Sequence, residues 1–431
     1  MRRTRALLAG TAVATLFLAA ACTTDTPTDT GGETSAEESP AGEESGGADS
    51  EWFVQADYDR QLAQREVVPE GPADQPWLQA IEPEYVDTAE FASAEGGNTL
   101  CFSNASVSNP WRVTGFITMQ QQVDVLTEAG VIGEFRVSDA ADDDNKQISD
   151  IQAFVAAGDC DAIVISPSTT ATLTPAVEAA CESGKPVIVF DRGVNTDCMV
   201  TFIHPIGGYA YGADGAEFLV ENLEPGSKVL ALRILPGVDV LENRWAAADK
   251  IFSESELEVV GAEFTGGDGA KIKDIVTQYL QRGDVDGIWM DAGDGAVAAV
   301  EAFEDAGKPY PVFMGEDEMS FLRKWKDTDM TAIGAVYSNF QWRTPILAAQ
   351  MIWAGEQVPS EWVLPQSPVV AEDLDAYLEA NKDMPSLHYA KFGGEDRPGF
   401  PEAWTDRCRP HPPGPAARPD HLGRPGRRPT G

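Results

Sequence analysis

An acidic and a basic residue directly follow a continuous apolar run near the middle of this sequence. The run, residues 187–190, is entered through Gly184-Lys185-Pro186 and ends at Asp191 and Arg192. Such a run is typical of a strand that is buried on both faces of a parallel sheet. Ligands of open α/β sheets bind outside the carboxyl ends of the strands, so this strand would carry a hydrogen-bond acceptor and a forked donor into a crevice. A structural ion pair at the start of a loop is the alternative.

The segments around this strand predict the first of two α/β units. Apolar runs that end near polar residues predict strands at residues 99–102, 133–137, 162–165 and 187–190. They alternate with predicted helices at residues 111–129, 146–157 and 173–183. Strands and helices that alternate at this spacing indicate a doubly wound lobe with a parallel sheet.

The same pattern repeats in the second half of the chain. Strands are predicted at residues 229–232, 257–264, 287–290, 312–314 and 331–336, with helices at residues 241–253, 268–282 and 296–306. A body of roughly 300 residues exceeds what one hydrophobic core usually supports, so the predicted fold class is α/β with two Rossmann-like, doubly wound lobes. The crevice between the lobes is the expected binding site.

The first 22 residues predict export rather than folded structure. Arginines at positions 2, 3 and 5 precede an apolar stretch, residues 7–21, that is too short to span a bilayer as a mature helix. The small residues before Cys22 resemble a bacterial lipobox, in which the cysteine is lipidated after cleavage. Leu18 lies one place early for the large apolar residue of that motif, so an ordinary secretory peptide with a chance cysteine stays open as an alternative.

Composition separates the folded body from flanking segments of a different character. Residues 23–50 are rich in Thr, Glu, Gly, Ser and Asp and predict a disordered acidic tether. Residues 51–97 carry spaced aromatic residues and prolines, and we expect them to wrap the domain surface. Residues 405–431 are basic and rich in Pro and Gly. They predict a disordered tail, which is either a genuine cationic segment or translation past a frameshift.

Charge and motif content exclude several classes of function. A formal net charge of −39 opposes binding to nucleic acid, which needs a basic face. The histidines have no neighbouring nucleophile motif, and the sequence has neither a P-loop nor metal-type Cys/His spacing, so we expect no enzyme, no cofactor and no metal site. The acidic loop at residues 141–145 lacks a correctly spaced bidentate Glu for calcium.

From about Asn98 to Phe392 the chain resembles the type I periplasmic sugar-binding proteins of ABC importers, the ribose-, xylose- and galactose-binding group, here in an actinobacterial-type lipoprotein. The motifs that carry the resemblance occur in the family's order and spacing, at residues 102–103, 108–112, 147–151, 162–167, 184–192, 243–244, 286–288 and 298–302. Repressors share this fold but need an N-terminal DNA-reading helix-turn-helix, where this chain has the lipobox and the acidic tether.

The resemblance implies how the chain builds the two lobes. The chain would cross between them three times, near residues 204–205, 337–338 and 363–365, and so form a three-stranded hinge that closes on ligand. The N-lobe would comprise residues 98–204 and 338–364. The C-lobe would comprise residues 205–337 and 365–404.

The resemblance also implies ligand contacts in the N-lobe. Asp191 would accept hydrogen bonds from two sugar hydroxyls, and Arg192 would donate to one or two more. Asn109 would donate and accept, and Trp111 would stack on the apolar face of the sugar ring, with core packing as its alternative. Arg112 lies on the same turn and would contact the ligand or point to solvent.

In the C-lobe the resemblance implies a second set of contacts. Arg244 would contact the ligand, with a surface ion pair as the alternative. The family's Asn-Asp pair reads Asp-Ala-Gly-Asp here, so either Asp291 or Asp294 would fill that place. Asp317 matches the acid after the next strand, with Glu316 as its rival.

Tyr337, near a hinge position, and Ser166, at the end of the third strand, complete the predicted contacts. The loop at residues 265–268 lacks the family's second aromatic residue, so the ligand is not restricted to ribose or glucose. The many acids of the cleft disfavour an anion, and we expect a small neutral sugar or a polyol. The expected protein is a monomer, anchored to the outer face of the cell membrane through Cys22, that delivers this ligand to ABC permease subunits. A ligand-sensing receptor for a sensor kinase or chemoreceptor is the alternative.

Five cysteines remain if Cys22 is lipidated. Cys101 lies in a predicted central strand and would be a free core thiol. Cys160 precedes the third strand and Cys181 ends the following helix, so both would lie at the bottom of the lobe, whereas Cys198 would lie at the top. A disulfide between Cys160 and Cys181 is therefore the expected bridge in an oxidising compartment, with all thiols reduced as the alternative.

Overall fold

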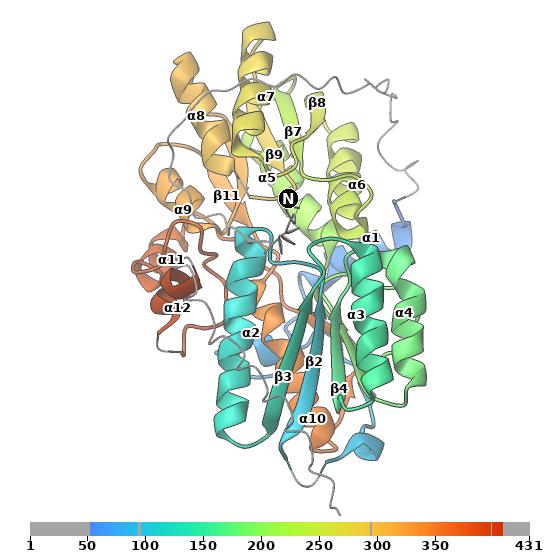
Figure 1. The fold of residues 1–431 in the computed structure, drawn as a ribbon. Coiled ribbons are helices and arrows are strands. Elements are labelled where there is room, and N and C mark those ends of the chain that lie inside the picture. Colours follow the sequence, from blue (N-terminus) through green and yellow to red (C-terminus); the bar gives the residue numbers. More distant parts are fainter. Residues whose placement is uncertain (1–51, 94–95, 294, 398, 408–431) are drawn as a thin grey trace, which may run out of the picture.

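The computed structural model describes residues 52–93, 96–293, 295–397 and 399–407. The predicted signal peptide with Cys22, the tether at residues 23–50, the site candidate Asp294 and the tail beyond residue 407 lie outside these residues. Within them, two α/β lobes are stacked one above the other, and helices from both ends of the described chain flank their junction (Figure 1).

The N-lobe is built on a six-stranded sheet in the order β13-β6-β5-β4-β2-β3, with every neighbouring pair parallel. Since β3 lies on one side of β2 and β4 on the other, the strand order reverses between β2 and β4, which is where open α/β sheets form their crevice. The strands are β2 (Asn98–Asn104), β3 (Ile132–Asp139), β4 (Ala162–Ser166), β5 (Val187–Phe190), β6 (Thr201–Pro205) and β13 (Glu361–Leu364).

Helices cover both faces of this sheet. The helices α2 (Pro110–Glu128) and α10 (Thr344–Trp353) pack on one face. The helices α3 (Asp144–Ala157) and α4 (Thr170–Glu182) pack on the other. Because water reaches neither face, every residue of β4 and β5 is buried, which explains their continuous apolar sequences.

The C-lobe repeats this architecture with a five-stranded parallel sheet in the order β11-β10-β9-β7-β8. The strands are β7 (Lys228–Arg233), β8 (Glu258–Phe264), β9 (Gly287–Met290), β10 (Val312–Glu316) and β11 (Ala332–Ala335). One face is covered by α5 (Gly208–Asn222) and α6 (Asp239–Ser253). The other is covered by α7 (Gly269–Arg282), α8 (Ala296–Ala306) and α9 (Met319–Lys326).

The prediction of two doubly wound lobes is confirmed, but the predicted elements did not include β6, β13, α5, α9 and α10. The helix α5 contains Gly208, Gly212 and Gly215, and each glycine lowers helix propensity by about 1 kcal/mol. A Cβ at Gly212 would collide with the carbonyl of Arg244 in α6, and a Cβ at Gly215 would collide with the sulfur of Met314 in β10. These glycines let α5 pack closely on its neighbours, a gain that local propensity does not reveal.

Three chain crossings join the lobes, as the family resemblance implied. The chain passes between them after β6, after β11, and after β13. Gln366, just after β13, accepts from the backbone N–H of Gly207 at 3.0 Å and donates to its carbonyl at 3.3 Å. The Ser338 hydroxyl donates to the Pro365 carbonyl at 3.2 Å. The three crossings are thus hydrogen-bonded to one another and form one hinge.

The segment before β2 lies across both lobes. Its helix α1 (Gln55–Gln64) packs on α5 of the C-lobe, where the Gln61 side chain accepts from the backbone N–H groups of Tyr209 at 2.9 Å and Ala210 at 3.3 Å. This contact satisfies N–H groups that a helix start otherwise leaves unpaired.

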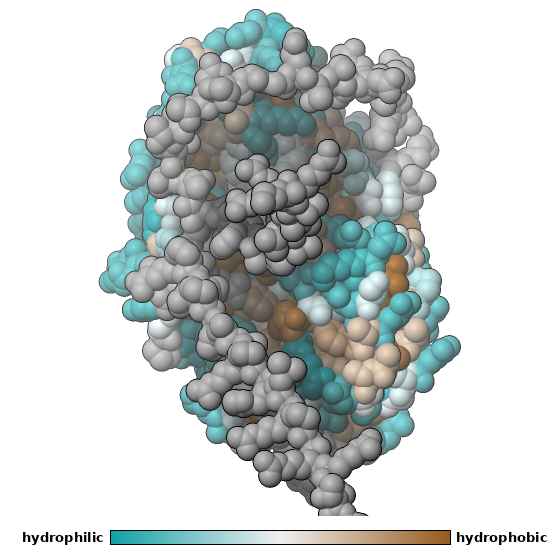
Figure 2. All heavy atoms as spheres, viewed as in Figure 1, coloured by the Kyte–Doolittle hydropathy of each residue, from teal (hydrophilic) through white to brown (hydrophobic). Residues whose placement is uncertain are grey.

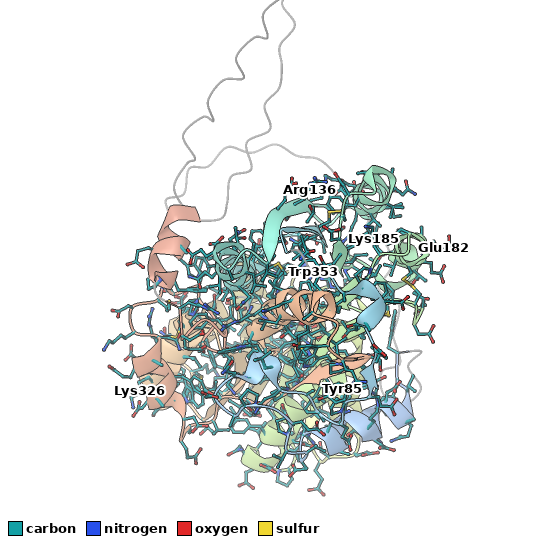
Figure 3. All side chains as sticks on the ribbon, turned by 90° about the horizontal axis from the view of Figure 1, so that it is seen from below. Tyr85, Arg136, Glu182, Lys185, Lys326 and Trp353 are labelled. Atoms are coloured by element: carbon teal, nitrogen blue, oxygen red, sulfur yellow. A yellow bond between two sulfur atoms is a disulfide. The ribbon has the colours of Figure 1, made fainter. Side chains whose placement is uncertain are left out.

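The rest of that segment packs on the N-lobe. It contains η1 (Pro76–Leu78), β1 (Tyr85–Val86) and η2 (Ala89–Phe91), and β1 pairs antiparallel with β12 (Val358–Pro359). The positions of Tyr85 in β1 and Trp353 in α10 can be followed in Figure 3.

The chain after β13 also reaches both lobes. The helix α11 (Leu374–Ala380) packs beside α9 of the C-lobe, whereas α12 (Phe400–Arg407) packs on α2 of the N-lobe. Both lie at the waist of the molecule on the side opposite α1 (Figure 1). The helix α12 extends three residues into the segment that was predicted to begin a disordered tail at residue 405.

Hydrophilic residues cover much of both lobes in the view of Figure 2. Among the helices of the described residues, we find none that combines the length and the apolar character needed to cross a membrane.

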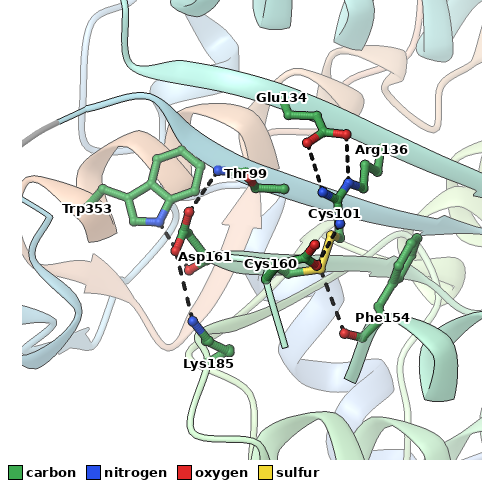
Figure 4. The surroundings of a disulfide bond; sticks show 10 residues. Thr99, Cys101, Glu134, Arg136, Phe154, Cys160, Asp161, Lys185 and Trp353 are labelled. Atoms are coloured by element: carbon green, nitrogen blue, oxygen red, sulfur yellow. Dashed lines mark hydrogen bonds and ion pairs between the residues drawn. A yellow bond between two sulfur atoms is a disulfide. The ribbon is translucent and has the colours of Figure 1, made fainter. Parts of the chain in front are cut away.

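The cysteine pairing differs from the predicted one. Cys101 is bonded to Cys160, and Cys181 is bonded to Cys198. Cys101 is therefore not a free thiol; it lies on β2 next to β4, and Cys160 just precedes β4 (Figure 4). The strand β6 runs parallel to β5, and no helix connects them, so the loop between them must return to the amino end of the sheet. That return places Cys198 at the bottom of the lobe beside Cys181.

We expect removal of each disulfide to destabilise the N-lobe, and the disulfide that closes the longer loop to contribute more. The sequence separations are 59 residues for Cys101–Cys160 and 17 residues for Cys181–Cys198. Chain entropy predicts losses of about 4 and about 3 kcal/mol in the free energy of unfolding for the two paired Cys→Ala variants. Urea unfolding measures both losses, and peptide mapping without reduction should recover both linkages. A Cys160–Cys181 peptide would contradict the structure.

Candidate ligand-binding site

Loops that follow the carboxyl ends of both sheets meet at the junction of the lobes and enclose an inner pocket of about 100 Å³. The N-lobe contributes the loops after β2 and β5, and the C-lobe contributes those after β7, β9, β10 and β11. The lining residues used below are Asn109, Trp111, Arg112, Asp191, Arg192, Arg244, Glu316, Tyr337 and Tyr389.

Asp191 occupies the centre of the N-lobe side. It follows the buried strand β5 in a left-handed backbone conformation, with φ of 71°, which Asp tolerates better than most residues. Its N–H donates to the Ile203 carbonyl at 3.0 Å, and its carboxylate accepts from Arg112 at 2.8 Å. The Tyr337 hydroxyl donates to the Asp191 carbonyl at 3.2 Å. Contacts from both lobes therefore fix a backbone geometry that is rarely populated.

The start of α2 supplies three of the predicted residues. Asn109 caps this helix, because its side-chain oxygen accepts from the Arg112 N–H at 2.9 Å, so only its amide NH₂ remains for a ligand. Trp111 donates from its indole to the Tyr337 carbonyl at 2.8 Å and so links α2 to the hinge. Arg112 does not point to solvent; it is buried, and its guanidinium pairs with Asp191.

Arg192 is the N-lobe cation without a carboxylate partner among the described residues. Its guanidinium donates to the Ser168 carbonyl. Burial and the nearby charge of Arg112 lower its pKa to about 10, so it stays protonated at neutral pH. Its remaining N–H groups are available to a ligand in the pocket.

Arg244 and Glu316 form the C-lobe side of the pocket. The Arg244 guanidinium lies over the rings of Tyr211 and Tyr337, 3.9 and 4.9 Å from their centroids, and donates to the Asp291 carbonyl. Arg244 and Glu316 are 3.9 Å apart and both are buried, so the alternative of a surface ion pair does not apply to Arg244.

The C-terminal segment adds a residue that the sequence did not suggest. Tyr389 donates to Glu316 at 3.0 Å and lines the inner pocket. Tyr211 donates to the same carboxylate at 3.1 Å. Tyr389 follows no predicted strand, and Tyr211 belongs to the glycine-rich helix α5, so no pattern marked either residue.

Glu316, rather than Asp317, faces the inner pocket. Neighbouring side chains at the end of a strand point to opposite faces, so only one of the two acids can reach the pocket. The Asp317 carboxylate accepts from the Lys391 N–H at 2.7 Å and does not line the pocket. Asp317 therefore holds the C-terminal segment in place, and Glu316 is the acid that lines the pocket.

Two other predicted residues lie behind the pocket rather than in it. One oxygen of Asp291 accepts from the Ile234 N–H at 2.8 Å, and its carbonyl orients Arg244. Ser166 is fully buried, and neither residue lines the inner pocket. Both are better placed to position the loops above the sheets than to touch a ligand. Asp294 falls outside the described residues.

The site carries unsatisfied hydrogen-bond donors. One terminal nitrogen of Arg112 and the Nε of Arg244 are buried, and neither has a hydrogen-bond partner among the described residues. Buried polar groups usually have a partner, so these two donors are candidates for contact with a ligand or an ordered water. Within the described residues no group of three or more His, Cys, Asp and Glu side chains is arranged to hold a metal ion.

Comparisons with known proteins identify the family and the fold that carry this pocket. The family described as periplasmic binding protein domain matches residues 100–357. The ribose import binding protein RbsB of Bacillus subtilis is 26% identical over 262 residues, which cover 60% of this chain and 83% of that protein.

Solved structures show the same fold. An ABC transporter solute binding protein from Thermobispora bispora matches with a TM-score of 0.61 at 22% identity, over 74% of this chain and 100% of that one. A solute binding protein from Bacillus halodurans, solved with bound myo-inositol, matches with a TM-score of 0.59 at 19% identity, over 66% and 99% of the two chains.

The carboxyls behind the pocket predict a stability that falls as pH rises. Burial raises the pKa of Asp291 and of Asp317 to about 7, above about 3.9 in an unfolded chain. A group whose pKa is higher in the folded protein than in the unfolded chain stabilises the fold fully below the unfolded pKa. This stabilisation is lost as the pH rises through the folded pKa, here between about pH 4 and 7. The Asp291→Asn variant keeps the Ile234 contact but cannot ionise. We therefore expect its Tm to fall less than the Tm of the parent protein when the pH rises from about 5 to 7.5.

Asp268→Asn is the matched control for that experiment. Asp268 is exposed and caps α7, a role that Asn also fills. Thermal unfolding at both pH values should therefore leave its pH dependence like that of the parent. An unchanged pH profile for Asp291→Asn would show that Asp291 does not carry the effect.

Proposed function

The chain belongs to the periplasmic binding protein domain family, as a type I sugar-binding protein of the ABC-importer kind, and from this premise we propose that it binds one small neutral sugar or polyol between its lobes and delivers it to a permease. The resemblance drawn from the sequence motifs is thereby confirmed at the level of the family. The ligand, the contact residues and the membrane anchor are our proposal.

One observation carries this proposal: paired acids and arginines from both lobes converge on a single pocket. Arg112 and Asp191 come from the N-lobe, Arg244 and Glu316 come from the C-lobe, and Tyr337 lies between them at the hinge. Each pair leaves N–H donors and carboxylate oxygens toward a ligand while its charges cancel. Sugar hydroxyls both donate and accept, so a neutral hydroxylated ring fits this alternation.

The size of the pocket favours a single small ring at its centre. A volume of about 100 Å³ lies below the range of roughly 300 to 1,000 Å³ typical of sites for drug-sized ligands. The relatives support a sugar or cyclic polyol, since one is named for ribose import and another was solved with myo-inositol.

Lobe closure is the step that would signal binding. A ligand that contacts Arg112 on one lobe and Arg244 on the other interacts fully only when the lobes are together. It therefore shifts the population toward the closed form by its difference in affinity for the two forms. The permease would recognise that form, and the protein would release its ligand unchanged.

Replacement of Asp191 should nearly abolish binding. Asp191→Asn keeps a residue that tolerates the left-handed conformation, but it removes the charge that orients Arg112. Loss of one partner of a buried charged pair predicts at least about a 30-fold weaker Kd. A thermal-shift screen over pentoses, hexoses, polyols and inositols identifies the ligand, and calorimetric titration gives the ratio.

Asp143→Asn serves as the control, because Asp143 is an exposed helix cap on the same lobe. It should bind like the parent. Equal affinity of Asp191→Asn and the parent would remove Asp191 from the site.

We also propose that Cys22 carries the lipid anchor. A lipidated cysteine at the end of the apolar stretch would place the protein outside the cell on a tether of residues 23–50. In a bacterial host, Cys22→Ala should lose incorporation of labelled fatty acid, and the protein should move from the membrane fraction to the soluble fraction. Labelling that survives in Cys22→Ala would refute the anchor without touching the binding proposal.

A further inference from the structure

A second pocket adjoins the inner pocket and is the larger of the two. This outer pocket encloses about 230 Å³, compared with about 100 Å³ for the inner one. Four residues line both pockets: Asp191, Arg192, Val240 and Tyr337. The two pockets are therefore neighbours, with these four residues at their common boundary.

Part of the outer pocket's wall comes from the segment before the family match at residue 100. The helix α1 contributes Asp57, Arg60 and Gln61. Gln61 holds the helix on the start of α5, and Arg60 pairs at 3.2 Å with Glu361, the first residue of β13 in the N-lobe. The outer pocket is therefore a built compartment with walls from α1, the hinge and both lobes.

The charges of the outer pocket largely cancel. Arg60 pairs with both Asp57 and Glu361, so these three side chains keep one net negative charge, whereas the charge of Asp191 is matched by Arg112. Arg192 and Asp239 remain, with opposite signs. A charged group of a ligand would be attracted by one of these two side chains and repelled by the other. The pocket therefore suits an uncharged part of a ligand.

Hydrogen-bonding groups are nevertheless available in the outer pocket. The helices α4 and α6 both begin there, and neither has a side chain that caps its first N–H groups. Among the described residues, the half-buried side chains of Asp239 and Asn243 have no hydrogen-bond partner, and both line the pocket. Phe202 and Tyr209 add aromatic surface. Free donors, free acceptors and flat apolar faces are what a second hydroxylated ring requires.

We propose that the cleft has two subsites, so that its preferred ligand is a disaccharide or a glycosylated polyol. The inner pocket holds one ring between Arg112 and Arg244. The outer pocket holds a second neutral ring or polyol chain against Asp239, Asn243 and α1. This inference rests on the proposed function and specifies the size of its ligand.

Titration of the purified protein with matched ligands tests the proposal. The probes are monosaccharides and inositol, and disaccharides or glycosylated inositols that contain them. We expect an extended ligand to bind at least about 10-fold more tightly than its single-ring component. Asp239→Asn and Asn243→Ala should each weaken the extended ligand about 5- to 10-fold and change the single ring less than about 2-fold.

The control variant is Asp268→Asn, at the exposed start of α7, and thermal unfolding without ligand verifies that each variant is folded. A single ring that binds while every extended ligand is rejected overturns the two-subsite inference and leaves the proposed function intact. Tighter binding of an extended ligand that neither variant weakens also overturns it. If no sugar, polyol or extended ligand binds, both proposals fall together.

Discussion

The buried ion pair between Arg112 and Asp191 is the interaction on which the rest of the cleft depends. Taking both charges out of water is unfavourable, and only the close contact with additional hydrogen bonds offsets that cost. Other hydrogen bonds hold the backbones of the two residues in place: the Asn109 cap accepts from the Arg112 N–H, Ile203 of β6 accepts from the Asp191 N–H, and Tyr337 of the hinge donates to the Asp191 carbonyl. Displacing any of these backbone contacts would shift one partner of the pair, so the pair is tied to α2, β6 and the hinge.

Sequence patterns identified the strands and the ends at which the site is built. Buried parallel strands are apolar along their whole length, so β4, β5 and β9 were recognisable, and Asp191 followed from β5. Sequence patterns did not predict the features that depend on contacts between distant chain segments. The glycines of α5 reflect its packing on α6, the Cys181–Cys198 bond reflects the return of the chain to β6, and Tyr389 reaches the pocket from a segment without a strand signal.

Segments from both ends of the described chain brace the junction between the lobes. Before β2, α1 holds the C-lobe while β1 pairs with β12 of the N-lobe. After β13, Tyr389 contacts Glu316 of the C-lobe and α12 packs on α2 of the N-lobe. Each brace has contacts on both sides of the hinge. For the lobes to open, each of these two chain segments must therefore break its contacts with one lobe or bend between its two contact points. These contacts add to the interactions that favour the closed form.

The balance of charge connects the cleft to the whole molecule. A chain with a formal net charge of −39 repels anions beyond contact distance, although salt screens that repulsion over about 8 Å at physiological ionic strength. Inside the cleft, the arginines are largely matched by Asp191, Glu316 and Glu361, so no strong positive field offsets the repulsion. The neutral ligand that we propose would avoid this penalty and could still accept from Arg112 and Arg244, each of which has one buried nitrogen without a hydrogen-bond partner among the described residues. The affinity must then come from the number of oriented hydrogen bonds to the ligand. A second subsite in this cleft would increase that number.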